Sequence, residues 1–309
     1  MGLNWPGASM VGGDMEAEDQ TAVQELLNDF ADRVEAHLQI MGLPPHASPL
    51  WRPWNLVVAW DAEKVIAAFS VLTGGMADLK WLDRKTQLFP PAELVRAIRD
   101  ELGQQVAAVV ILPLPQASDR KVILEVAAQQ HAREVERASR LGRLGDLTGV
   151  AHLEPHLRDF LNDHPDPDKN VFVMMRFLTS PQLDEVHASI RDTLATRGFH
   201  AVRADDRDYT GELWSNIEVY MTCCRLGIAV FEDIESRDFN PNVSLELGYM
   251  LGRRKRCLIL KEQRLPDLPA DVVHRLYKPF DMFNVGVSVS REVARWVDVD
   301  LGVGAVGAP

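Results

Sequence analysis

Residues 240–260 read NPNVSLELGYMLGRRKRCLIL, and this stretch decides the fold class that the sequence predicts. Asn240 is a good helix N-cap residue, and Pro241 suits the first helical position, where its missing N–H costs nothing. Apolar residues then recur at helical spacing until Gly252, which is expected to end the helix. Residues 257–260 form a short apolar run, typical of a strand in a parallel sheet that is covered on both faces.

Working outward, the same alternation of strands and helices extends over the whole second half of the chain. The expected strands are residues 171–177, 199–204, 226–231 and 257–260, with a weak one at 278–283. The expected helices are residues 180–197, 211–224, 241–252, 269–274 and 288–297. This spacing predicts an α/β domain with a parallel sheet and helices on both faces.

The first half also mixes strands with helices. The expected helices are residues 16–41, 61–72, 90–103 and 118–140, and the expected strands are residues 54–60 and 106–112. The run HPDPDK at residues 164–169 has two prolines and several charges, which leaves no room for a regular element. We therefore expect two domains, a separate α/β N-terminal domain at residues 1–168 and a second domain at residues 169–300.

Composition sets limits on the function. The 309 residues carry a formal net charge of -12, which argues against a general nucleic-acid or anionic-membrane binder. No apolar run is long enough to cross a bilayer, and the first thirty residues lack the apolar core of a signal peptide. Three cysteines cannot build a disulfide framework or a four-cysteine zinc site. The sequence predicts a cytoplasmic protein with no membrane segment.

Four of the seven tryptophans, Trp51, Trp54, Trp60 and Trp81, lie close together in the first half. Such a cluster is more often part of a core, and the alternative is a stacking pocket for a flat ligand. His152 and His156 have a four-residue spacing, but Pro155 between them weakens a helix and no third ligand is evident. No metal site is expected.

Ligands of open parallel sheets bind beyond the carboxyl ends of the strands, near the point where strand order reverses. The chain has no P-loop, and its G-x-G-x-x-G run, at residues 302–307, follows the last predicted helix and no predicted strand, so it is no dinucleotide fingerprint. The candidate site residues therefore follow the predicted strands: Arg176 and Phe177 after the first, Asp205 after the second, and Asp233 after the third. Glu246 joins them from the helix that opens at Asn240.

Four segments resemble the TIR-like and nucleoside 2-deoxyribosyltransferase-like proteins of bacteria. They are VFVMMRF, LGIAVFED, NPNVSLELGYMLG and LPADVVHRLYKPFD, and the resemblance covers residues 170 to 298. The family pattern has an aromatic residue after the first strand, an Asp after the third, and Asn-x-x-x-Glu-x-Gly in the next helix. The matching residues here are Phe177, Asp233, Asn242, Glu246 and Gly248. Arg176 departs from the pattern, because small residues or proline are common at its position.

The resemblance implies a flavodoxin-like domain that binds a nucleotide and cleaves an N-glycosidic bond. It implies that Glu246 is the catalytic residue, and that the nucleotide is bound by Arg176, Phe177, Asp205, Asp233, Asn242 and Trp214. Other interpretations stay open at four of these residues. Asp205 is alternatively part of a solvated loop. Glu246 is alternatively a first-turn glutamate favoured by the helix dipole. Arg176 is alternatively an ion-pair partner of Asp205 or Asp233, and Trp214 is alternatively a core residue.

The function that follows as an expectation is hydrolysis of NAD to nicotinamide and ADP-ribose, with NAD as substrate and no cofactor. A TIR-like end further suggests a bacterial effector in antiviral defence. The alternatives are a nucleoside deoxyribosyltransferase, a nucleotide hydrolase, or a non-catalytic module that senses a nucleotide. The amphipathic helix at residues 23–41 and the tryptophan cluster suggest that the N-terminal domain assembles a homo-oligomer or binds a protein partner.

Overall fold

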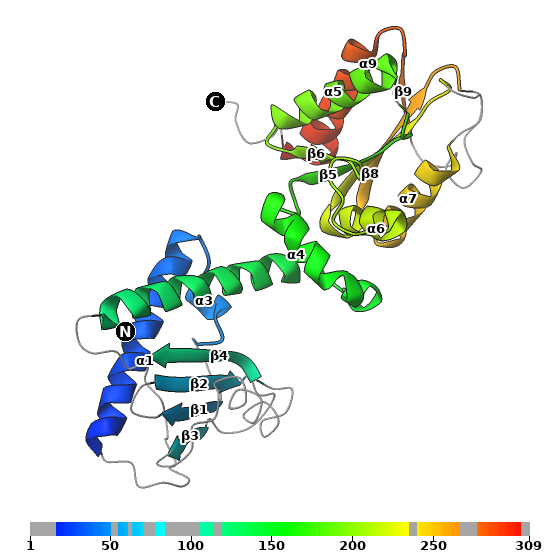
Figure 1. Cartoon of the computed structure of the whole chain (residues 1–309). Helices are drawn as coiled ribbons and strands as arrows, with labels where there is room; N and C mark the ends of the chain where they lie inside the picture. Colours follow the sequence, from blue (N-terminus) through cyan, green and yellow to red (C-terminus); the bar gives the residue numbers. More distant parts are fainter. Residues whose placement is uncertain are drawn as a thin grey trace, which may run out of the picture. The chain divides into compact units, whose positions relative to one another are not determined.

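The computed structural model describes residues 17–50, 55–60, 64–70, 78–83, 106–113, 119–178, 180–234, 240–265 and 277–303. The chain divides into two compact units, Met1–Ser139 and Arg140–Pro309. Each unit has its own sheet and its own apolar core (Figure 1). Both units are α/β, as the sequence predicts.

The first unit contains a four-stranded mixed sheet with the strand order β3-β1-β2-β4. Its strands are β1 (Asn55–Trp60), β2 (Lys64–Ser70), β3 (Asp78–Asp83) and β4 (Val106–Pro113). The helical elements are α1 (Ala17–Ile40), the short η1 (Pro45–Ala47) and α3 (Arg120–Gly142), whose last residues belong to the second unit. Strand β2 pairs antiparallel with β1 and β4, whereas β3 pairs parallel with β1.

Helix α1 buries its apolar face inside this unit. Leu26, Phe30 and Leu38 are almost inaccessible and form one cluster with Leu124 of α3 and Leu112 of β4. The amphipathic face that the sequence offered as a contact surface for a partner is therefore occupied by the unit's own core. A partner of the N-terminal unit stays a prediction, but this face of α1 does not bind it.

The expected helix at residues 61–72 is wrong, because residues 64–70 form strand β2. This segment, KVIAAFS, pairs along its length with β1 on one side and β4 on the other. Cross-strand pairing outweighs the weak helical preference of its two alanines. The expected helix at residues 90–103, and Trp51 and Trp54, lie outside the described residues.

The second unit contains a five-stranded sheet with the order β6-β5-β7-β8-β9, in which every neighbouring pair is parallel. The strands are β5 (Asn170–Met174), β6 (His200–Val202), β7 (Leu226–Phe231), β8 (Arg256–Glu262) and β9 (Lys278–Phe280). The helices are η3 (Thr148–Leu153), α4 (Glu154–Asp163), α5 (Pro181–Ala195), α6 (Leu213–Cys223), α7 (Pro241–Gly252), α9 (Val285–Arg295) and the π-helical η4 (Trp296–Asp300). This is the flavodoxin-like strand order, with helices on both faces.

The two faces of this sheet carry separate cores. Phe172 and Met174 of β5 belong to the cluster with α4, α6 and α7, whereas Val171 and Val173 belong to the cluster with α5 and α9. Figure 1 shows these two helix layers on opposite sides of the sheet. Because side chains of a strand alternate between faces, both sets must be apolar, which explains why β5 and β7 are buried along their whole length.

The predicted domain boundary at residues 164–169 differs from the division in the structure, which falls between Ser139 and Arg140. Residues 164–169 connect α4 to β5 within the second unit. Phe160 of α4 is fully buried in the same cluster as the sheet residues. The connection itself is held by Arg143, which pairs with Asp166 and Asp168. The prolines interrupt regular structure there, but tertiary contacts keep the segment within the unit.

In the described part of the chain, no helix is both long enough and apolar enough to cross a membrane. The expected helix at residues 269–274 and most of the LPADVVHRLYKPFD segment lie outside the described residues. The remaining helices and all five strands that the sequence predicts for the second unit are present, with ends that differ by a few residues.

We predict that Gly227→Ala destabilises the second unit by about 1–3 kcal/mol, the usual cost of overpacking. A Cβ atom at Gly227 of β7 would lie 2.8 Å from Met174 Cε and 3.0 Å from Cys257 Sγ. Gly248→Ala is the matched control, because nothing lies within 4 Å of its added Cβ atom. In a helix interior this change should stabilise by about 0.5–1 kcal/mol. Denaturant unfolding gives the change in the free energy of unfolding for both variants. Equal changes in the two variants would contradict the close packing at Gly227.

Candidate functional site

The candidate site lies at the carboxyl edge of the second unit's sheet. The chain passes from β5 to β6 on one side and then continues with β7 on the other side of β5. Strand order therefore reverses between β5 and β7, and loops that leave these two strands diverge. The segments that follow them carry Arg176 and Glu232, and the N-terminus of α7 follows β7 along the chain.

Glu246 occupies a core-facing position of α7. The buried residues of this helix are Val243, Glu246, Leu247 and Met250, which form one stripe at helical spacing. The three apolar members belong to the core cluster beneath α6 and α7. The helix begins as the sequence predicts, because Asn240 Oδ1 accepts a hydrogen bond from the Asn242 backbone N–H at 3.0 Å. A carboxylate has thus been placed where the helical period calls for an apolar side chain.

Burial dominates the electrostatics of this carboxylate. Glu246 is only 5% exposed, and desolvation raises its pKa from 4.5 to about 7. In the described part of the chain it has neither a hydrogen-bond partner nor an ion-pair partner. It also lies in the second turn of α7, beyond the first turn where the helix dipole favours acids, so the dipole does not explain it. A buried acid with a raised pKa and no partner among the described residues is a functional-site candidate.

Two aromatic side chains lie beside each other on α6 and α7. The ring centroids of Trp214 and Tyr249 are 6.5 Å apart, with the rings in edge-to-face geometry. The Tyr249 hydroxyl donates to Glu218 Oε1 at 3.1 Å, which fixes this ring. Trp214 is 43% exposed, so it is not a core residue. Its free face can stack on a planar ligand such as a nucleobase.

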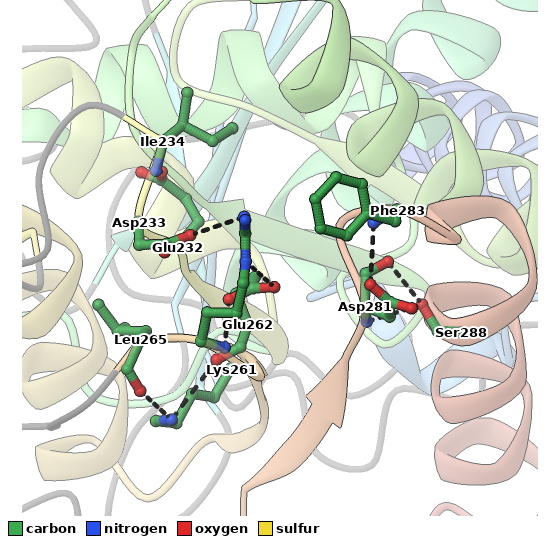
Figure 2. Close-up of polar contacts among 10 residues, drawn as sticks. Glu232, Asp233, Ile234, Lys261, Glu262, Leu265, Asp281, Phe283 and Ser288 are labelled. Carbon is green, nitrogen blue, oxygen red and sulfur yellow. Dashed lines mark hydrogen bonds and ion pairs between the residues drawn. The ribbon is translucent and has the colours of Figure 1, made fainter.

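Arg176 and Glu232 form an ion pair across the point where strand order reverses. The distance from Arg176 Nε to Glu232 Oε1 is 2.7 Å, and the Glu232 side chain is almost fully buried. Glu232 Oε2 also accepts the Ile234 backbone N–H at 2.6 Å, as Figure 2 shows. The sequence predicted that an ion pair of Arg176 would involve Asp205 or Asp233. Among the described residues the ion-pair partner is instead Glu232, which sequence reasoning missed.

A second charged network connects β7 to β8. Arg264 contacts Asp233 Oδ1 at 3.4 Å and Glu262 Oε1 at 3.2 Å, and Glu262 also accepts the Arg264 backbone N–H. Lys261 is buried and donates to the backbone carbonyl of Leu265. Figure 2 shows Glu232, Asp233 and Glu262 around this network, beside the turn in which Asp281 and Ser288 are hydrogen-bonded. The Arg264 side chain remains about half exposed, so it can reach a ligand anion.

The other predicted site residues are spread along the same edge. Asp205 pairs with Arg203 in its own exposed loop. Asn242 is exposed at the start of α7, and Phe177 is 48% exposed after β5. Within the described ranges, none of the three forms a hydrogen bond or an ion pair with Glu246. The structure therefore brings together Trp214 and Tyr249, and Asp233 and Arg264, but not the predicted set as a whole.

The missed residues share a simple signal. Glu232 and Glu262 each stand at the carboxyl end of an apolar strand, in the runs VFED and ILKE. An acid at such a position is a candidate for the ligand-binding edge of a parallel sheet. In the described ranges, no group of three or more His, Cys, Asp or Glu side chains is placed to hold a metal ion.

The buried acid predicts an unusual dependence of stability on pH. The folded state raises the pKa of Glu246, so its proton is bound more tightly when the chain is folded. The folded state therefore loses stability as pH rises from 4.5 towards 7, by about 3 kcal/mol in total. Glutamine cannot ionise, so Glu246→Gln should escape this loss. We expect the variant to gain about 3 kcal/mol over the wild type between about pH 4.5 and pH 8, in denaturant unfolding. A difference that does not change with pH would contradict the burial of a free acid.

The comparisons with known proteins assign no family. No family model matches the chain. No curated protein matches it. Among solved structures, it is similar to the rubredoxin oxygen:oxidoreductase of the anaerobe Desulfovibrio gigas, at 13% identity and a TM-score of 0.29. The match covers 68% of this chain and 49% of that chain, so this chain spans about half the length of that protein. No residue role is carried over from it.

Proposed function

We propose that the second unit cleaves the N-glycosidic bond of a nucleotide, with NAD as its first substrate and nicotinamide and ADP-ribose as products. The observation that carries this proposal is Glu246, a buried acid with a pKa of about 7 and no partner among the described residues. The resemblance of the Asn-x-x-x-Glu-x-Gly segment to TIR-like proteins points to the same residue. Antiviral defence remains the biological setting that this resemblance suggests.

Cleavage of the N-glycosidic bond requires a negative charge close to the anomeric carbon of the ribose. When the bond between ribose and nicotinamide breaks, the bonding electron pair leaves with the nicotinamide, whose ring was cationic and becomes neutral. Positive charge develops at the anomeric carbon of the ribose, and a nearby carboxylate stabilises it or attacks it. Water then adds to that carbon and releases one proton. The leaving group needs no general acid.

The burial of Glu246 suits this role. A carboxylate in an apolar setting interacts more strongly with a developing positive charge than one in water does. A cationic nicotinamide ring nearby also favours the ionised acid and lowers its pKa. Desolvation raises the pKa of Glu246, and a bound cationic substrate lowers it. Substrate binding would therefore itself favour the ionised form of Glu246.

Neighbouring residues offer contacts for the rest of a nucleotide. Trp214 has an exposed ring for stacking on a base, and Asp233 has carboxylate oxygens for ribose hydroxyls. Arg264 is half exposed and positively charged, which suits a phosphate. Arg176 is engaged by Glu232, so we assign it to fixing the loop after β7 in place of direct ligand contact.

A second candidate is a module that binds a nucleotide without cleaving it. It is favoured by one observation, namely that no second acid or base contacts Glu246 in the described part of the chain. Incubation of the full chain with NAD and a panel of nucleosides, followed by chromatography, separates the candidates. Release of nicotinamide supports the NAD hydrolase, transfer of deoxyribose between bases supports the deoxyribosyltransferase alternative, and binding without released base supports the sensor.

For the hydrolase, Glu246→Gln should lower the rate of nicotinamide release by more than about a hundredfold. Glutamine keeps the shape of the side chain but cannot supply the charge, so NAD affinity should change little. Glu292→Gln is the matched control, because Glu292 is also a buried glutamate on a helix, but it packs on the α5 and α9 side of the sheet and pairs with Arg291. Turnover of Glu246→Gln close to that of the control would exclude Glu246 from the mechanism.

The pH profile gives an independent check. If the ionised form of Glu246 acts on the sugar carbon, kcat/KM should rise with pH and reach a plateau above about 7, the pKa of the free acid. Below that pH the ionised fraction falls about tenfold per unit. The measurement is the initial rate of nicotinamide release between about pH 5 and pH 9. A rate that falls as pH rises through 7 would instead assign Glu246 as a general acid.

A further inference from the structure

The amino edge of the second unit's sheet contains a cleft with a volume of about 920 Å³. It lies between the C-terminal ends of α6 and α7 and the beginnings of β7 and β8, with the loop after α3 as a further wall. Its charged lining consists of Arg225, the basic run at residues 253–256, Asp146 and Asp168.

The cleft is a positive region on an acidic chain. Its lining has five basic and two acidic side chains, an excess of three positive charges, whereas the whole chain has a formal net charge of -12. Asp168 is engaged by Arg225 at 3.0 Å and also by Arg143. Asp146 accepts hydrogen bonds from Thr148, which hold its pKa below the ordinary value.

Arg225 forms an ion pair with Asp168, whereas the contacts of Arg253 and Arg256 orient these side chains without neutralising them. Arg253 donates to the backbone carbonyl of Asp146 at 2.6 Å, and Arg256 donates to the carbonyl of Asp300. Carbonyl oxygens carry no net charge, so the positive charge of each guanidinium stays available to a ligand. Lys255 differs, because its ammonium is half-buried and donates to three carbonyls at the end of α6, those of Met221, Thr222 and Cys224. Its role is structural.

Arg254 supplies the second, independent observation. Its backbone has φ +59°, the left-handed region, and it is the one non-glycine residue of the described chain with positive φ. The bonds from Arg254 N–H to Leu251 O and from Lys255 N–H to Met250 O form a Schellman motif, in which this position usually holds glycine. Gly252 is the last residue of α7, as the sequence predicts, but the left-handed position falls two residues later, at Arg254. An arginine thus stands where glycine would fit without strain, and its exposed side chain has no partner among the described residues.

We propose that this cleft binds a phosphate-bearing small molecule, and that Arg254 is one of its ligand-binding residues. Guanidinium groups match phosphate oxygens with two parallel hydrogen bonds, which favours phosphate over a single-charge anion. The volume is in the range of small-molecule sites, roughly 300–1,000 Å³. The lining of the cleft does not include Glu246, so the proposal does not depend on the proposed catalytic role of that residue.

Calorimetric titration of the full chain with inorganic pyrophosphate at about 0.15 M salt tests the proposal. We expect saturable binding, and a loss of about tenfold or more in affinity in Arg254→Gly. The same substitution should leave the melting temperature unchanged or raise it, because glycine relieves the left-handed backbone. Arg254→Asn is a second variant that tolerates this conformation and also removes the guanidinium. Loss of affinity with retained folding is a result that a purely structural role of Arg254 would not give.

Two controls locate the binding. Arg295→Ser removes another exposed arginine, on α9 at the other face of the sheet, and should leave pyrophosphate affinity unchanged. Glu246→Gln should also leave it unchanged, which separates this cleft from the proposed catalytic site. The proposal is overturned if pyrophosphate does not bind, if both Arg254 variants bind it as the wild type does, or if a polyglutamate peptide binds the cleft more tightly than pyrophosphate.

Discussion

The burial of the second unit's sheet on both faces is the constraint from which the rest of its structure follows. Every residue of β5 and β7 is buried, so helices must cover both sides. Polar chemistry is then confined to the two edges where strands begin and end. At the carboxyl edge the buried acids Glu232 and Glu262 pair with Arg176 and Arg264. At the amino edge, basic side chains outnumber acidic ones in the cleft beside Arg225 and Arg256.

Glu246 and Lys255 illustrate two ways of placing a charged group near this core. The Lys255 ammonium lies against three carbonyl oxygens, which replace the water that burial removes. Burial still lowers its pKa, to about 8, so it stays charged at neutral pH. Glu246 has no such compensation among the described residues. The fold therefore provides polar partners for Lys255, and it leaves Glu246 without one among the described residues.

The sequence predicted most of the second unit, because each of its strands is a compact apolar run and each helix has a clear start. Even the burial of Glu246 follows from the spacing of Val243, Leu247 and Met250. Contacts between residues that are far apart in the sequence could not be predicted. Arg176 and Glu232 are 56 residues apart, and local sequence does not show that they meet. The helix expected at residues 61–72 failed for the same reason, since pairing with β1 and β4 decides that segment. The run at residues 164–169 has the composition of a linker. It belongs to the second unit, where Arg143 forms an ion pair with Asp166, and this contact cannot be inferred from the local sequence.

The positions of the cysteines have a practical consequence. All three, Cys223, Cys224 and Cys257, lie in the second unit, and burial raises the pKa of the Cys224 thiol to about 12 and that of Cys223 as well. Thiols in this state do not react with alkylating reagents until the structure around them opens. The rate at which an alkylating reagent labels these two cysteines therefore measures the opening of the second unit alone, in the intact chain, without an engineered label and without signal from the first unit.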